Sequence, residues 1–241
     1  MSESLMIPWS LLDTAQMPDG GGELRLKRRG DEFSIFLDNY ELMNSRRGGS
    51  EQALATLGCE RMRSRERPQV LIGGLGMGFT LGATLAAVGA DAQIIVAELV
   101  PEVIGWARGA MAEVFGKSLD DPRVHIHEAD VGQLIRSNPS TYDAILLDVD
   151  NGPEGLTRKA NDALYDLEGL RAAHAALRAG GVFAVWSSGP DSRFTQRLRK
   201  AGFDVEEASA RANGSRGARH IIWIATRGVR AGRAGLRTVL K

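Results

Sequence analysis

The chain has very little cysteine and no long apolar run. Cys59 is its only cysteine, so an intrachain disulfide is impossible and a cysteine-bound metal cluster is disfavoured. No stretch approaches the roughly 18 uncharged apolar residues that a transmembrane helix needs. The opening residues, MSESLMIPWSLL, lack the basic start and apolar core of a secretory leader. We therefore expect a cytoplasmic protein that does not enter a membrane.

Neither sign of charge dominates. Thirty basic and 30 acidic residues give a formal net charge of zero, so no overall field attracts nucleic acid or an anionic membrane. The 241 residues, 43% of them hydrophobic, suffice for one large α/β domain with a small appendage. We expect a β-rich segment at residues 1–48, the main domain at 49–227 and a basic tail at 228–241.

Short apolar runs alternate with amphipathic helices from Gln69 onward, which is typical of βαβ units on a parallel sheet. Five strand candidates are apolar nearly throughout, as strands covered on both faces must be; they begin at Gln69, Gln93, Arg123, Tyr142 and Gly181. Later runs at Asp204 and Ala218 indicate a closing hairpin. This pattern predicts an α/β, Rossmann-like fold with a mostly parallel seven-stranded sheet and helices on both faces.

The segment before this domain has a different pattern. Two alternating runs, at Glu23 and Phe33, predict a small antiparallel hairpin or meander. After Gly48 and Gly49, a run of helix formers predicts a helix that begins at a Ser50 cap.

A glycine-rich turn, GGLGMG at Gly73–Gly78, joins the first predicted strand of the main domain to its helix. Glycines let backbone N–H groups approach a ligand, and the helix N-terminus adds a positive end. The alternative is a turn that serves only close packing.

Acidic residues follow the next three strands: Glu98, Asp130 and Asp148. The carboxyl ends of parallel strands line one crevice, where ligands collect. A carboxylate after the second strand can accept both hydroxyls of a ribose, and an acid after the third can accept from an adenine amino group. Each could instead be a helix cap or a solvated acid, but together with the glycine turn they indicate an adenosine site.

These motifs resemble the spermidine synthase family of aminopropyltransferases, which shares its sheet with class I methyltransferases. The resemblance runs from about Gly22 to Arg227 through VLIGGLGMG, VAELVPEVIGWAR, DPRVHIHEAD, YDAILLDVDNGP and LRAGGVFAVW. It implies that Glu98 holds the ribose, that Asp130 and Val131 hold the adenine, and that Asp148 holds the ammonium of the donor's side chain. It also implies a homodimer. The full set expected to bind the donor is Gly74, Gly76, Met77, Gly78, Glu98, Leu99, Asp130, Val131 and Asp148.

The sequence departs from the family pattern on the donor side. Met77 stands where the family has an aspartate facing the aminopropyl end, and a thioether cannot pair an ammonium. Arg46 and Arg47 replace an acidic segment, and an arginine pair would suit the carboxylate of intact S-adenosylmethionine. The alternative for these arginines is a solvated turn.

The acceptor side departs as well. Asn151 stands where the family has the aspartate that takes the proton from the attacking amine, and an asparagine cannot act as a base. The nearest acid, Asp150, is therefore our candidate base, with Asp148 orienting the donor. Ser50 and Glu51 replace the Tyr-His or Tyr-Gln pair of the polyamine site. Putrescine is therefore a doubtful acceptor.

The sequence thus predicts a transferase that uses S-adenosylmethionine or its decarboxylated form as co-substrate, without a metal. Methyl transfer is slightly favoured over aminopropyl transfer, and the acceptor is a small amine or hydroxyl compound. Trp186 and Ser187 would floor the acceptor pocket, and residues 152–166 would gate it. The alternatives are a catalytically silent adenosyl-nucleoside-binding, dimer-forming module and an NAD-dependent reductase.

Two other features have plainer interpretations. His125 and His127 alternate on the third strand and could form a metal pair, but no third ligand accompanies them. Packing against the core or a helix is the favoured interpretation of both. The arginines of the tail are interpreted as a solvated end rather than an RNA contact.

Overall fold

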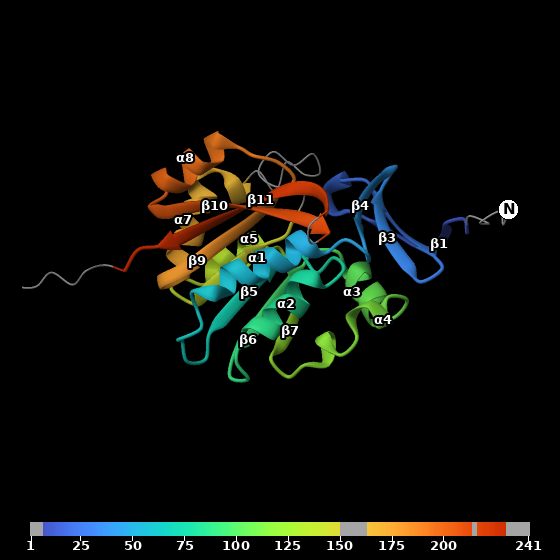
Figure 1. The fold of residues 1–241 in the computed structure, drawn as a ribbon, viewed down its shortest axis with the longest axis horizontal. Coiled ribbons are helices and arrows are strands. Elements are labelled where there is room, and N and C mark those ends of the chain that lie inside the picture. Colours follow the sequence, from blue (N-terminus) through green and yellow to red (C-terminus); the bar gives the residue numbers. More distant parts are fainter. Residues whose placement is uncertain (1–6, 150–162, 214–215, 230–241) are drawn as a thin grey trace, which may run out of the picture.

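A computed structural model describes residues 7–149, 163–213 and 216–229. Its first element is a four-stranded antiparallel sheet in the order β1-β2-β3-β4 (Figure 1). The strands are β1 (Ser10–Gln16), β2 (Glu23–Arg29), β3 (Glu32–Leu37) and β4 (Tyr40–Asn44), with a short 3-10 helix, η1 (Pro18–Gly20), between the first two. The predicted hairpin corresponds to β2 and β3, while the flanking strands β1 and β4 were not predicted.

The main sheet has seven strands in the order β10-β11-β9-β8-β5-β6-β7. Strands β5 to β9 pair in parallel, whereas β11 runs antiparallel to both of its neighbours. Its strands are β5 (Gln69–Gly73), β6 (Gln93–Glu98), β7 (Val124–Glu128), β8 (Tyr142–Leu147), β9 (Leu177–Ser187), β10 (Phe203–Asn213) and β11 (Arg216–Arg227). The predicted fold class is confirmed, including the closing hairpin.

Helices cover both faces of this sheet, because its strands send alternate apolar side chains to opposite sides. Val70 and Ile72 of β5 pack with α1 (Gly49–Glu60), α2 (Phe79–Ala87), α3 (Pro101–Arg108) and α4 (Ala112–Phe115). Leu71 packs on the other face with α5 (Val131–Ser137), α7 (Leu167–Ala176) and α8 (Ser192–Lys200). A 3-10 helix, η2 (Ser118–Asp120), precedes β7. Within the described residues, no helix is both long and apolar enough to cross a bilayer.

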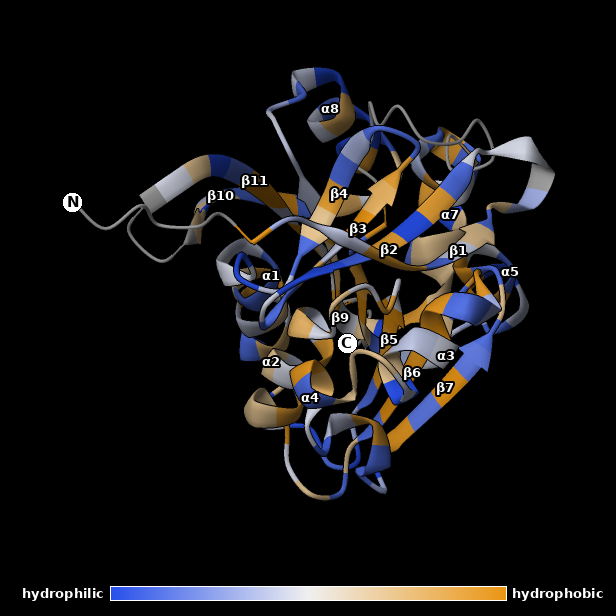
Figure 2. Ribbon diagram, turned by 90° about the vertical axis from the view of Figure 1, so that its right-hand side faces the viewer, coloured by the Kyte–Doolittle hydropathy of each residue, from blue (hydrophilic) through white to orange (hydrophobic). Residues whose placement is uncertain are grey.

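Strand β7 corrects one sequence interpretation. It forms the edge of the main sheet, and Figure 2 shows hydrophobic and hydrophilic residues alternating along it. His125 and His127 are both exposed, so neither packs into the core. An edge strand is covered less completely than the strands beside it, which is why its polar positions face solvent.

Candidate active site

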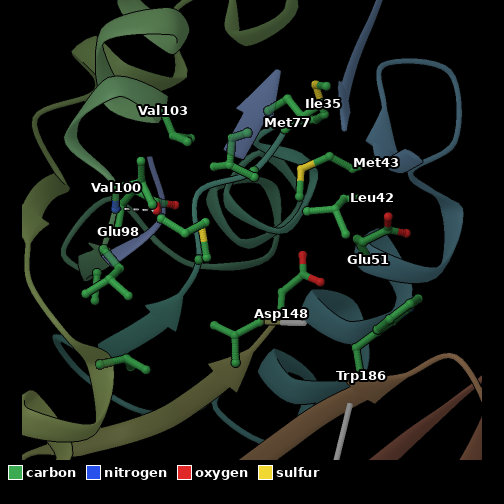
Figure 3. A pocket seen from close by; sticks show the side chains of 18 of the residues that line it. Ile35, Leu42, Met43, Glu51, Met77, Glu98, Val100, Val103, Asp148 and Trp186 are labelled. Atoms are coloured by element: carbon green, nitrogen blue, oxygen red, sulfur yellow. Dashed lines mark hydrogen bonds between the residues drawn. The ribbon is translucent and has the colours of Figure 1, made fainter. Parts of the chain in front are cut away.

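A cavity of about 180 Å³ lies between the N-terminal sheet and the carboxyl ends of β5, β6 and β8 (Figure 3). The N-terminal sheet contributes apolar side chains, among them Leu24, Ile35 and Met43. The main domain contributes the glycine turn and the ends of its central strands. The cavity therefore lies at the crevice that the strand order predicts for ligands. Its lining includes eight of the nine predicted donor-binding residues: Gly74, Gly76, Met77, Glu98, Leu99, Asp130, Val131 and Asp148.

The glycine turn holds its shape because three of its residues adopt left-handed backbone. Gly74, Gly76 and Gly78 have φ angles of 88°, 49° and 76°, which only glycine adopts without strain. A side chain on Gly74 would also lie 2.6 Å from the backbone oxygen of Asp148. Gly78 is the predicted donor-binding residue that does not line the cavity. Its α-carbon faces the ring of Phe115, so its absent side chain serves packing.

Gly74→Ala is expected to destabilise the protein by about 3 kcal/mol, because it combines backbone strain with a clash against main chain. Gly82→Ala on α2 is the matched control, since no atom lies within 4 Å of the added methyl group; a helical alanine there should be neutral or slightly stabilising. Urea unfolding of both variants measures the difference. Equal stabilities would show that the turn is not constrained in this way.

Glu98 lies at the end of β6 and is only 8% exposed. Its two carboxylate oxygens accept hydrogen bonds from the backbone N–H groups of Leu75 and Val100, each at 2.9 Å. Burial raises the pKa of Glu98, and the backbone donors partly offset this. The carboxylate thus fixes the glycine turn to β6. Glu98 also lines the cavity, where its carboxylate can accept from a ribose hydroxyl.

Asp130 is both a helix cap and a lining residue. Its Oδ1 accepts from the backbone N–H of Gly132 at 2.6 Å and of Gln133 at 3.3 Å, which caps α5. The capping alternative raised by the sequence is therefore real. It does not exclude the adenine role, because a carboxylate that caps through one oxygen still has the other.

Asp148 follows β8 and is anchored beside the glycine turn. Its backbone N–H donates to Gly73 at 3.1 Å, and its Oδ2 accepts a hydrogen bond from the Thr80 hydroxyl at 2.8 Å. Burial, together with the negative charge of Glu51, raises the pKa of Asp148 to about 7, against a lowering by Thr80. A cation bound here would relieve that electrostatic cost.

Glu51 is the other carboxylate on this side of the cavity, and Figure 3 shows it near Trp186 and across from Glu98. It lies in the first turn of α1, whose N-cap is Gly48 rather than the predicted Ser50. Ser50 is instead fully buried and donates its hydroxyl to Glu51 Oε2 at 2.6 Å. The indole N–H of Trp186 is buried without a hydrogen-bond partner among the described residues.

The cavity is therefore acidic. Its charged lining residues are Glu51, Glu98, Asp130 and Asp148, and the described part of the lining contains no lysine, arginine or histidine. An enclosed surface with charge of a single sign favours a ligand of the opposite sign. The geometry suits a cationic ligand with an adenosine-like body.

Comparison with known proteins agrees with this geometry. Residues 60–195 match the Spermine/spermidine synthase domain family. The chain belongs to the spermine/spermidine synthase family. The matched region holds the glycine turn together with Glu98, Asp130 and Asp148.

Curated relatives in this family are distant. The chain is 29% identical over 192 residues to a polyamine aminopropyltransferase of Mycobacterium tuberculosis, which covers 76% of this chain and 35% of that protein. It is 32% identical over 129 residues to polyamine aminopropyltransferase 2 of Pseudomonas aeruginosa, covering 52% of this chain and 35% of that protein. The chain thus spans about a third of the length of these relatives.

Solved spermidine synthases share the fold. The enzyme of Thermotoga maritima superposes with a TM-score of 0.72 at 20% identity, covering 91% of this chain and 73% of that one. A probable spermidine synthase of Corynebacterium glutamicum gives a TM-score of 0.62 at 14% identity, covering 90% and 79%. The N-terminal sheet falls within this shared architecture.

Some of the residues that differ from the family pattern line the cavity, and others lie away from it. Met77 is buried in the cavity wall. Arg46 and Arg47 are exposed and do not line the cavity; Arg46 pairs with Glu32 at 3.4 Å. The solvated-turn interpretation of this pair therefore describes it better. Asp150 and Asn151, together with most of the predicted gating segment, lie outside the described residues.

Proposed function

We propose that this chain transfers an aminopropyl group from decarboxylated S-adenosylmethionine to an amine. The observation that carries the proposal is the acidic cavity, in which the charge of Glu51 adds to the cost of ionising buried Asp148. The decarboxylated donor carries a sulfonium and an ammonium and no carboxylate. Its binding replaces repulsion between the two acids with attraction.

Intact S-adenosylmethionine fits this lining less well. Its carboxylate would have to lie among Glu51 and Asp148 without a basic partner in the described lining. The arginine pair that favoured methyl transfer is exposed, and Arg46 is paired with Glu32. The lining therefore favours the decarboxylated donor over the intact one, and so aminopropyl transfer over methyl transfer. The names of the two curated relatives point in the same direction.

Several lining residues have defined roles in this proposal. Glu98 accepts the ribose hydroxyls, Asp130 and Val131 bind the adenine, and backbone N–H groups of the glycine turn lie beneath the nucleoside. Asp148 pairs with the donor's ammonium, which compensates for the thioether of Met77. Glu51, beside Trp186, faces the acceptor amine. Aligning the amine, the carbon and the sulfonium supplies most of the catalysis, because the sulfonium is already a good leaving group.

Turnover with each donor separately tests the proposal. Purified protein is incubated with decarboxylated or intact S-adenosylmethionine and a panel of mono-, di- and polyamines, and the nucleoside product is identified by mass spectrometry. We expect methylthioadenosine from the decarboxylated donor. Formation of S-adenosylhomocysteine from the intact donor would assign methyl transfer instead, and donor binding without any product would assign a silent binding module.

Glu51→Gln tests the acceptor side of the site. We expect about a hundredfold loss in kcat/KM for the amine, because a neutral amide neither pairs with an ammonium nor accepts its proton. Calorimetric donor affinity should change less than tenfold. Glu60→Gln, at the exposed end of the same helix, is the matched control and should behave as wild type. Equal kinetics in the two variants would remove Glu51 from the site.

A further inference from the structure

A chain of hydrogen bonds leads from Glu51 away from the cavity. Ser50 Oγ lies 2.6 Å from Glu51 Oε2 and 2.8 Å from His220 Nδ1. Ser50 is fully buried, whereas His220, on β11, is partly exposed. The chain therefore connects a carboxylate in the cavity wall to an imidazole that can exchange protons with solvent. Ser50 and His220 are 170 positions apart in the sequence.

We propose that His220 receives, through the Ser50 hydroxyl, the proton that Glu51 takes from the acceptor amine. This inference rests on the proposed aminopropyl transfer. It gives Ser50 and His220 positioning roles, since only Glu51 faces the substrate. It also provides a route for the proton within the described residues, in a chain whose sequence has Asn151 at the position of the family's base.

The proton balance is simple. The acceptor enters as an ammonium and gives one proton to the Glu51 carboxylate, which frees the nitrogen lone pair. That nitrogen attacks the carbon attached to sulfur; the C–N bond forms, the C–S bond breaks, and its electron pair leaves on sulfur as a neutral thioether. Once protonated, Glu51 donates to Ser50 Oγ, so the Ser50 hydroxyl, which donates to the Glu51 carboxylate at rest, turns and passes its own proton to Nδ1 of His220 in its Nε2–H tautomer. The imidazolium then releases its Nε2 proton to water, which leaves a neutral ring and a Ser50 hydroxyl that again donates to Glu51. Exchange between the two tautomers returns the ring to its Nε2–H form before the next turnover.

The surroundings of His220 suit a transient proton acceptor. Trp186 packs edge-on against the ring with centroids 4.7 Å apart, and Ala210 lies opposite it on β10. Burial lowers the pKa of His220. The negative charge of Glu51, on α1, has the smaller, opposite effect and raises it. The resting ring is therefore neutral near pH 7 and able to accept a proton, while the nearby carboxylate limits the cost of the imidazolium.

Two substitutions test the path by kinetics. His220→Gln and Ser50→Ala should each lower kcat for methylthioadenosine formation 10- to 100-fold, with donor affinity within twofold of wild type. The double variant should lose no more than either single variant, because both interrupt one path. In wild type, kcat should fall as the pH drops and His220 becomes protonated, and this fall should be absent from His220→Gln.

The matched control is His174→Gln, because His174 is also partly buried with a lowered pKa but lies on α7, against Phe203. It should keep wild-type kcat and the wild-type pH profile. Wild-type turnover together with unchanged kcat in His220→Gln would overturn the path and leave the proposed function intact. A wild-type protein that forms no methylthioadenosine with any amine would overturn both.

Imidazole NMR provides a readout that needs no turnover. The chain has 4 histidines, so each ring can be assigned by substitution and titrated. Glu51→Gln should lower the pKa of His220, because the anion that stabilises its imidazolium is removed. The pKa of His174 should stay the same. An unchanged His220 pKa would show that Glu51 and His220 are not connected.

Discussion

Asp148→Asn is expected to lower kcat/KM for the decarboxylated donor about a thousandfold. The amide keeps the size of the side chain and can still accept from Thr80, but it removes the charge that faces the donor's ammonium. An ammonium enclosed without its anion loses several kcal/mol of interaction. Initial rates of methylthioadenosine formation over a range of donor concentrations measure the effect. A loss below tenfold would mean that Asp148 does not contact the reacting donor.

The same variant has a stability signature that serves as its control. In the folded protein the pKa of Asp148 is raised to about 7, whereas the ordinary pKa of an aspartate is 3.8. Raising the pH from 4 to 8 therefore ionises the unfolded chain first and weakens the wild-type fold. Asp148→Asn should be more stable than wild type at pH 8 by about 2 kcal/mol, discounted for partial exposure, and equally stable below pH 4. Equal stability at both pH values would contradict the electrostatic cost assigned to Asp148.

Glu98→Gln is expected to weaken donor binding at least a hundredfold. The amide keeps one oxygen but turns an NH₂ group toward Leu75 or Val100, whose backbone N–H groups now reach the two carboxylate oxygens. One buried donor loses its partner, and the ribose hydroxyls lose one of the two oxygens that can accept from them. Isothermal titration with the decarboxylated donor gives the Kd.

Glu128→Gln is the matched control for this substitution. Glu128 pairs with Glu98 in the β6–β7 register but is exposed. Its substitution should leave the Kd unchanged. If the two variants bound the donor equally well, Glu98 would have no part in holding the ribose.

The sequence predicted the main sheet because its strands carry a local signal. Buried parallel strands are runs of apolar residues, and the turns between them are marked by glycine or proline. The sequence also predicted that the acids after these strands share one crevice. Glu98, Asp130 and Asp148 lie in one cavity because parallel strands end at the same edge.

Other features depend on contacts that spacing does not encode. Glu51 looks like an ordinary acid in the first turn of a helix, and only the packing of α1 against the main sheet places it near Asp148. The contact between Ser50 and His220 joins distant parts of the chain. Arg46 and Arg47 showed the opposite problem. Their charge suggested a ligand, but both are exposed in the turn after β4, and Arg46 pairs with Glu32.

The central claim is that an acidic cavity selects a donor that lacks a carboxylate. Competitive isothermal titration of the wild-type protein with decarboxylated and intact S-adenosylmethionine tests it most directly. We expect the decarboxylated donor to bind at least tenfold more tightly, and this preference to shrink in Glu51→Gln and Asp148→Asn. Equal affinities, or tighter binding of the intact donor, would contradict the account.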